Sequence, residues 1–102
     1  MDEHETDRGK ILARGEKQLE SERAIVWRWT LPPGSHTGWH RHGHDYIVMP
    51  VKGGPLRIWD GTAMHAAAME PGVPYVRAAG VTHDVINDGP GEIVFVEIET
   101  KG

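Results

Sequence analysis

Two histidines separated by one residue are the first feature of this sequence that could carry chemistry. They end the run GSHTGWHRH at residues 34–42. Side chains two residues apart on a strand point to the same face, so His40 and His42 would lie side by side. Two imidazoles on one face can offer nitrogens to a single metal ion, or they can share an interior wall. The pair alone leaves both interpretations open.

A third histidine extends the pattern, because residues 72–87 read G-x5-A-x-G-x2-H-x3-N. Together with residues 34–53, this segment resembles the cupin superfamily, whose motifs are G-x5-H-x-H-x3,4-E-x6-G and G-x5-P-x-G-x2-H-x3-N. The chain departs from them at Tyr46, where the family has Glu, and at Ala78, where it has Pro. The matching positions are Gly34, His40, His42, Gly53, Gly72, Gly80, His83 and Asn87.

The resemblance implies an all-β fold, the small double-stranded β-helix or jelly-roll barrel of cupins, with a divalent metal near the barrel axis. It makes His40, His42 and His83 the metal ligands and Asn87 a structural residue. Three protein ligands leave coordination positions open for water, substrate or dioxygen, which is the layout of a catalytic site. Imidazoles suit iron, zinc, nickel and manganese alike, so these residues do not select the metal.

Tyr46 stands where the cupin pattern has its glutamate. A phenol has a pKa near 10, which makes it a poor ligand at neutral pH. Without the glutamate the site would carry a charge nearer +2, which favours an anionic substrate. Tyr46 is then either a catalytic hydrogen-bond donor to a bound oxygen or a tyrosine of the core. His44 could reach the metal or the substrate, but it lies in a predicted turn at 43–45, which favours an exposed position.

Arginines on predicted strands could hold a substrate carboxylate through two parallel hydrogen bonds if they face the cavity. Exposed strand arginines are the alternative, because alternation alone does not say which face is inside. The candidates are Arg28, Arg57 and Arg77. The four tryptophans could line a pocket or belong to the core or an interface. Three other histidines match no motif position and are expected at the surface: His4, His36 and His65.

Short strands must position these side chains. The 13 Gly and 7 Pro divide the chain into short apolar or alternating runs. Asp60-Gly61 is a two-residue hairpin signal, and the alanines at 66–68 give the strand after it a competing helical propensity. We expect eight or nine strands and no long helix, packed as two sheets or a closed barrel. Seven of these strands are predicted at 24–31, 46–51, 56–59, 62–69, 75–78, 83–86 and 92–100.

The 102 residues are enough for one domain. We expect a polar N-terminal arm at 1–17 and a single barrel domain at 18–102. Within the arm, Ile11-Leu12-Ala13 could form a short strand. Open sheet edges need covering, so we also expect a homodimer in which the arm pairs across subunits.

Composition argues against several classes of partner and location. The formal net charge is −4 without a cluster of Lys and Arg, which argues against nucleic acid. No apolar run approaches the roughly 18 residues needed to span a bilayer. The N-terminus lacks the basic and apolar regions of a signal peptide, so we expect a cytoplasmic protein. Cysteine is absent, which excludes disulfides, thiolate ligands and a cysteine nucleophile.

Two classes of function fit these observations. The first is an enzyme whose three-histidine metal centre acts on a small anionic molecule, dioxygenase-like with iron, or an isomerase or lyase with zinc, nickel or manganese. The second is a cupin that binds a metal or small ligand without catalysis, because one fold hosts many functions. The runs at 42–50 and 81–87 are similar to small cupins associated with β-alanine degradation, which implies an amino-acid-derived substrate.

Overall fold

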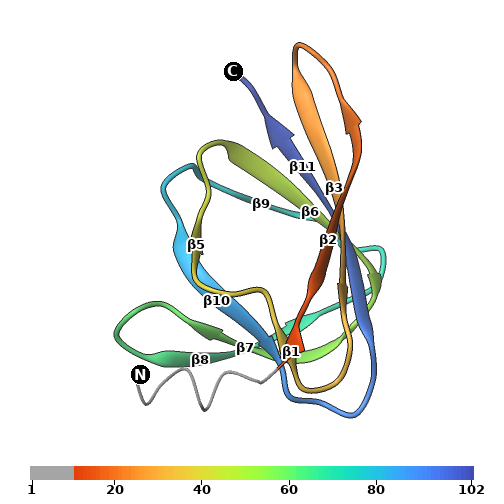
Figure 1. Ribbon diagram of the computed structural model, residues 1–102, viewed down its shortest axis with the longest axis vertical. Helices are drawn as coiled ribbons and strands as arrows, with labels where there is room; N and C mark the ends of the chain where they lie inside the picture. Colours follow the sequence, from red (N-terminus) through yellow and green to blue (C-terminus); the bar gives the residue numbers. More distant parts are fainter. Residues whose placement is uncertain (1–10) are drawn as a thin grey trace.

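The computed structural model describes residues 11–102, which form eleven strands and no helix (Figure 1). Two sheets face each other across the interior, so the all-β architecture expected from the sequence is confirmed. No helix able to cross a membrane occurs in this part of the chain. The strands are β1 (Ile11–Leu12), β2 (Arg14–Glu20), β3 (Ala24–Leu31), β4 (Ser35–His36), β5 (His40–Arg41), β6 (Asp45–Lys52), β7 (Gly54–Trp59), β8 (Met64–Met69), β9 (Tyr75–Arg77), β10 (Thr82–Asn87) and β11 (Ile93–Thr100).

The five-stranded sheet is antiparallel with the order β2-β3-β11-β6-β9. β3 and β11 pair along their whole length, with Leu31 opposite Ile93 at one end. Both residues are buried in the core, so every second residue of these strands faces the interior. The interior face therefore also receives Trp29 and Glu97, and this sheet forms one wall of the site.

The other sheet has the order β1-β4-β10-β7-β8, and β5 pairs with β10 beside it. The hairpin between β7 and β8 turns at Asp60-Gly61, where Gly61 has a φ of +99° and the Asp60 carboxylate accepts two backbone N–H groups. Trp59 pairs with Met64, so the loop spans residues 60–63 and is longer than the two-residue turn predicted. The alanines at 66–68 belong to β8 rather than to a helix. Their pairing with residues 55–57 of β7 outweighs their helical propensity.

The N-terminal segment is joined to both sheets. Ile11 and Leu12 form β1, which pairs in parallel with β4, so the short strand expected there is present. β2 continues from Arg14 to Glu20 and crosses the boundary that the sequence placed at residue 17. It pairs with β3 in antiparallel register, with a register shift between Lys17 and Leu19, and all of its residues are exposed. His4 lies outside the described residues.

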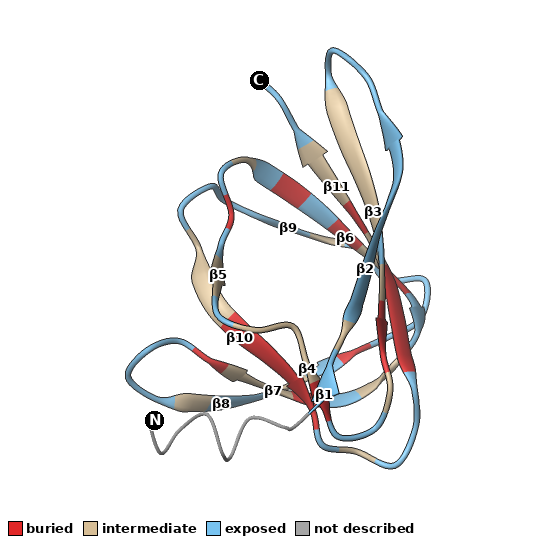
Figure 2. Cartoon of the chain, viewed as in Figure 1, coloured by how far each residue is buried: buried red, intermediate tan, exposed pale blue. Residues whose placement is uncertain are grey.

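The core lies between the sheets, where buried residues gather on β6, β7, β10 and β11 (Figure 2). Asn87 ends β10 and is fully buried, and its side-chain amide donates to the carbonyls of Leu31 and Gly91 at 2.8 Å. These bonds tie the end of β10 to β3 and to the turn before β11. Asn87 therefore has the structural role that the motif implied.

Candidate metal centre

The three motif histidines come from two segments that run side by side. His40 lies in β5, which pairs with β10 so that His40 is the register partner of His83. His42 follows β5 in a bend, where its N–H donates to Val81 O at 2.9 Å and its carbonyl accepts from Gly80 N at 2.8 Å. β5 is shorter than a regular strand, yet these bonds keep His42 beside β10 and on the same face as His40.

The Nε2 atoms of these imidazoles converge. Those of His40 and His42 are 3.0 Å apart, and those of His42 and His83 are 3.2 Å apart. Nitrogens bound to one metal at about 2.0–2.1 Å would be separated by about 2.9–3.4 Å at angles of roughly 90–110°. The three side chains therefore could hold a divalent ion at three neighbouring coordination positions.

The hydrogen bond at Nδ1 of His40 determines which ring nitrogen has its lone pair available for a metal. His40 Nδ1 lies 2.7 Å from the carbonyl of Gly38, which can only accept a hydrogen bond. The proton of the neutral ring therefore sits on Nδ1, and Nε2 offers its lone pair to the cluster. This pattern is the usual way in which proteins orient a metal-binding histidine.

Burial keeps the other two imidazoles neutral. The pKa of His42 falls from 6.5 to about 4, first because of burial and then because of repulsion from His40. The pKa of His83 falls to about 3 for the same first reason, with repulsion from His40, His42 and Arg77 added. Neutral imidazoles are the form that binds metal, so no proton has to be displaced from them at neutral pH.

Glu97 is a charged group near the cluster that the motif analysis missed. It is 6% exposed on β11, and its Oε1 lies 3.9 Å from His42 Nδ1, the nitrogen that faces away from the cluster. Burial first, and then the charge of Glu99, raises the pKa of Glu97 to about 7, while a hydrogen bond from Trp29 opposes the rise. The expected site charge near +2 therefore needs correction, because a carboxyl group lies close behind one ligand.

Tyr46 is packed in the core and also borders the site. It is 2% exposed, and its ring stacks on His42 with centroids 3.8 Å apart and planes 18° apart. Burial, and then the charge of Glu97, raises the pKa of Tyr46, so the hydroxyl keeps its proton. This hydroxyl has no hydrogen-bond partner among the described residues. The ring therefore belongs to the core, one of the two roles left open by the sequence, while the catalytic donor role of the hydroxyl stays a prediction.

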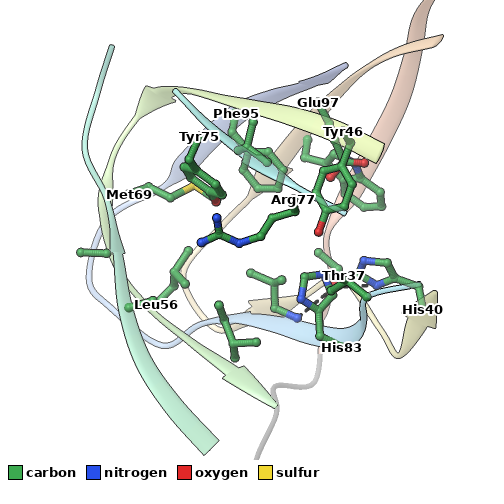
Figure 3. A pocket seen from close by; sticks show the side chains of 17 residues that line it. Thr37, His40, Tyr46, Leu56, Met69, Tyr75, Arg77, His83, Phe95 and Glu97 are labelled. Atoms are coloured by element: carbon green, nitrogen blue, oxygen red, sulfur yellow. Dashed lines mark hydrogen bonds between the residues drawn. The ribbon is translucent and has the colours of Figure 1, made fainter. Parts of the chain in front are cut away.

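A cavity of about 270 Å³ opens beside the cluster, between the two sheets (Figure 3). His40 and His83 lie at one side of it, and Arg77 extends into it below the ring of Tyr75. The guanidinium lies 4.5 Å from the centre of the Tyr75 ring and donates to the carbonyl of Val76 at 2.9 Å. The cavity therefore joins the open side of the histidine cluster to a fixed positive charge.

The other candidate contacts lie elsewhere. Arg57 is held by Asp88 at 2.6 Å. Arg28 is exposed and alternates with the inward-facing tryptophans of β3, which places it on the outer face of the sheet. His44 is half-buried in the bend before β6 and is outside the histidine cluster. Of the three arginines, only Arg77 borders the cavity.

His36 was expected at the surface, but its side chain is mostly buried. Its side chain is 16% exposed, and its Nδ1 lies 3.0 Å from a carboxylate oxygen of the fully buried Asp84. Asp84 also accepts from the backbone N–H of Gly38 at 3.0 Å. The loop before β5 is therefore fastened to β10 beside His83. His65 is exposed, as expected.

The four tryptophans lie in different surroundings: two line hollows, one is buried and one is half exposed. Trp29 borders the cavity beside the cluster and also a second hollow on its other side, which Trp27 lines. Trp59 is buried, and Trp39 is half exposed. Both the pocket and the core interpretations therefore apply, each to different tryptophans.

Sequence and structure comparisons agree with this geometry. A cupin domain from Bordetella pertussis, solved by crystallography, superposes with a TM-score of 0.88 at 43% identity and covers 91% of this chain and 97% of its own. This chain is a cupin. The beta-alanine degradation protein BauB of Pseudomonas aeruginosa is 44% identical over 84 residues, which are 82% of this cupin and 88% of that protein. No protein-family model matches the sequence.

More distant structures share the fold alone. An RmlC-like cupin from Methanocaldococcus jannaschii with a double-stranded β-helix has a TM-score of 0.73 at 15% identity, and covers 91% of this cupin and 84% of its own chain. A double-stranded β-helix protein from Klebsiella pneumoniae also has a TM-score of 0.73, at 20% identity, covering 95% and 86%. These proteins therefore share the barrel fold with this cupin although most of their residues differ from it.

Proposed function

We propose that this cupin is a metal-dependent enzyme that acts on a small organic anion. His40, His42 and His83 would hold the metal, and the cavity side of the cluster would remain open for substrate. The observation that carries the proposal is the clustering of three imidazoles on the wall of a cavity, with the Nε2 atom of His42 at 3.0 Å from that of His40 and 3.2 Å from that of His83. A bound metal would supply Lewis acidity or, as iron, the capacity to bind dioxygen.

The residues around the cluster supply what such chemistry needs from the protein. Arg77 gives the cavity a positive charge that favours an anion. The Tyr46 hydroxyl keeps its proton and can donate to an oxygen of the substrate. Buried aliphatic side chains such as Leu56 and Val85 exclude water from the same space, which strengthens both interactions.

The relative's name supports a narrower substrate range. A protein that is 44% identical is named for β-alanine degradation, and the two chains match over most of their lengths. An anion derived from an amino acid therefore fits this cupin. A dioxygenase-like reaction with iron is the first candidate chemistry, and isomerase or lyase chemistry with zinc, nickel or manganese is the second.

A turnover screen tests this proposal. Metal-free protein would be loaded separately with Fe(II), Zn²⁺, Ni²⁺ and Mn²⁺ under anaerobic conditions. It would then be given small carboxylates while oxygen uptake and product NMR spectra are recorded. We expect turnover with one metal, and its loss in His83→Ala but not in the exposed His65→Ala. Full metal retention without turnover of any carboxylate would contradict catalysis and leave a binding protein.

A further inference from the structure

The cavity beside the histidine cluster is cut into the hydrophobic core. Nine of its lining side chains are aliphatic, thioether or aromatic hydrocarbon: Val48, Leu56, Ile58, Ala67, Ala68, Met69, Val81, Val85 and Phe95. Five of these belong to the buried core, and Ile58 packs against it. Its volume of about 270 Å³ lies below the roughly 300–1,000 Å³ of pockets for drug-sized ligands. The space therefore suits a small ligand with a hydrocarbon portion.

One polar side chain in this wall lacks a partner. The Tyr46 hydroxyl is buried without a hydrogen bond from any described residue, and Figure 3 shows it directed into the cavity. A buried hydroxyl without a partner is costly, so such groups normally bond to protein, water or ligand. The position of Tyr46 therefore points to an acceptor atom supplied by whatever occupies the cavity.

Arg77 shares the cavity with this hydroxyl, and Figure 3 shows its guanidinium extended beneath the ring of Tyr75. Tyr46 and Arg77 are direct register partners on β6 and β9, and side chains paired in this way leave a sheet about 5 Å apart on the same face. One guanidinium N–H is used by the carbonyl of Val76, and the rest of the group borders the cavity. Both donors border the same cavity, so a carboxylate that lies between them can accept hydrogen bonds from both.

Among the described residues, one acidic side chain lines the cavity and could pair with an ammonium group. This side chain is Glu97, but it receives the hydrogen bond from Trp29 and faces the ring of His42. A zwitterionic amino acid would therefore bring its ammonium into an apolar wall with little compensation.

We infer that the cavity binds a small monocarboxylate with a hydrocarbon body and without a neighbouring ammonium group. Arg77 and Tyr46 hold the carboxylate, and the aliphatic wall formed by residues such as Leu56 and Met69 holds the hydrocarbon body. This inference rests on the proposed function, since it names the substrate class of the same site. It separates the ligand of this cupin from β-alanine itself, which has an ammonium group and almost no hydrocarbon body.

Isothermal titration calorimetry on the full-length protein tests this with three matched probes: propionate, 4-methylpentanoate and leucine. Burial of each additional carbon is worth about fourfold in affinity, so 4-methylpentanoate should bind on the order of 50-fold tighter than propionate. Leucine has the same branched body with an added ammonium, and it should bind at least tenfold more weakly than 4-methylpentanoate. Equal affinities within either pair would overturn the inference.

Substitutions at Arg77 and Tyr46 test whether these two residues bind the carboxylate. Arg77→Gln should weaken binding of 4-methylpentanoate by at least tenfold, whereas Arg28→Gln, on the outer face of the sheet, should leave it unchanged. Tyr46→Phe keeps the ring on His42 and removes only the hydroxyl, so it should weaken binding without lowering the melting temperature. Unchanged affinity in both Arg77→Gln and Tyr46→Phe would overturn the assignment.

Titrations of metal-free and zinc-loaded protein separate this inference from the proposed function. Binding by the metal-free protein with the same dependence on Arg77 supports the inference even if the wild type retains no metal and the proposed function fails. Retained metal together with absence of carboxylate binding in both forms overturns the inference and leaves the metal centre intact.

Discussion

At the scale of single residues, the metal centre depends on the acceptors behind its ligands as much as on the ligands. The carbonyl of Gly38 accepts from the outer nitrogen of His40, and the carboxyl group of Glu97 lies 3.9 Å from that of His42. Glu97 thus places an acidic group, with a pKa of about 7, close to the cluster although position 46 carries tyrosine. A negative charge behind an imidazole raises its basicity and favours metal binding.

Glu97→Gln should therefore weaken metal binding by about 10–100-fold. The matched control is Glu99→Gln, because Glu99 lies on the same strand two residues further along and is only half-buried. Competition with a chromophoric chelator measures both affinities for zinc. If the two variants bind zinc as tightly as the wild type, Glu97 does not support the centre.

The sequence predicts which histidines meet but not what surrounds them. His40, His42 and His83 could be grouped because motif spacing and strand alternation act over short distances along the chain. Glu97 belongs to no motif, and only the antiparallel pairing of β11 with β6 brings it to the site. Its signal in the sequence is that it follows Ile93 and Phe95 in the inward-facing alternation of β11, where the pattern changes from apolar to acidic residues.

At the scale of elements, the loop between β4 and β5 sets the position of His40. The carboxylate of Asp84 fastens the N–H of Gly38, and the carbonyl of the same glycine holds His40. Gly38 has a φ of +89°, which other residues adopt at a cost of about 1–2 kcal/mol. The burial of His36 follows from the same Asp84 contact, which neither motif could indicate.

Gly38→Ala should weaken zinc binding by about tenfold, because the strained loop displaces the carbonyl that orients His40. Gly34→Ala is the control, since Gly34 has a similar φ of +82° and lies outside the histidine cluster. Added methyl groups have space at both positions, so both variants should lose similar stability, about 1–2 kcal/mol. Thermal melts and zinc titrations separate the effects. Equal zinc affinities in the two variants would refute the role of this loop.

At the scale of the whole molecule, burial of the site makes the stability of the metal-free protein depend on pH. The pKa values of His42 and His83 are about 4 and 3 in the folded chain, against 6.5 ordinarily. As pH falls below 6.5, these two histidines become protonated in the unfolded chain but stay neutral in the folded chain. The free energy of unfolding therefore decreases. Glu97 acts oppositely between pH 4.5 and 7, where the folded chain keeps a proton that the unfolded chain has lost.

The two histidines bind two more protons in the unfolded chain than in the folded chain, whereas Glu97 binds one more in the folded chain. The free energy of unfolding should therefore decrease as pH falls from 6.5 to 4.5. The slope is about 1.4 kcal/mol per pH unit for one net proton. Glu97→Gln removes the opposing contribution and should roughly double the slope. Urea denaturation of chelator-treated protein across this range measures both. A slope in the Gln variant no steeper than in the wild type would contradict this account.

The outer face of the five-stranded sheet supports the homodimer expected from the sequence, which stays a prediction. Aliphatic side chains stand in register across all five strands of this face: Leu19, Val26, Ile98, Ile47 and Val76. A second copy would cover this row and the exposed edge of β2. Light scattering should give twice the mass of the chain at micromolar concentration, and a monomer mass would refute the dimer.

The metal content of the purified protein tests the central claim most directly. Elemental analysis of untagged protein, purified without chelator under anaerobic conditions, should find close to one divalent metal per chain. His83→Ala should retain almost none, because only two imidazoles remain, while His65→Ala should match the wild type. A wild-type protein that carries no metal and takes up none on addition of iron, zinc, nickel or manganese would contradict the metal centre.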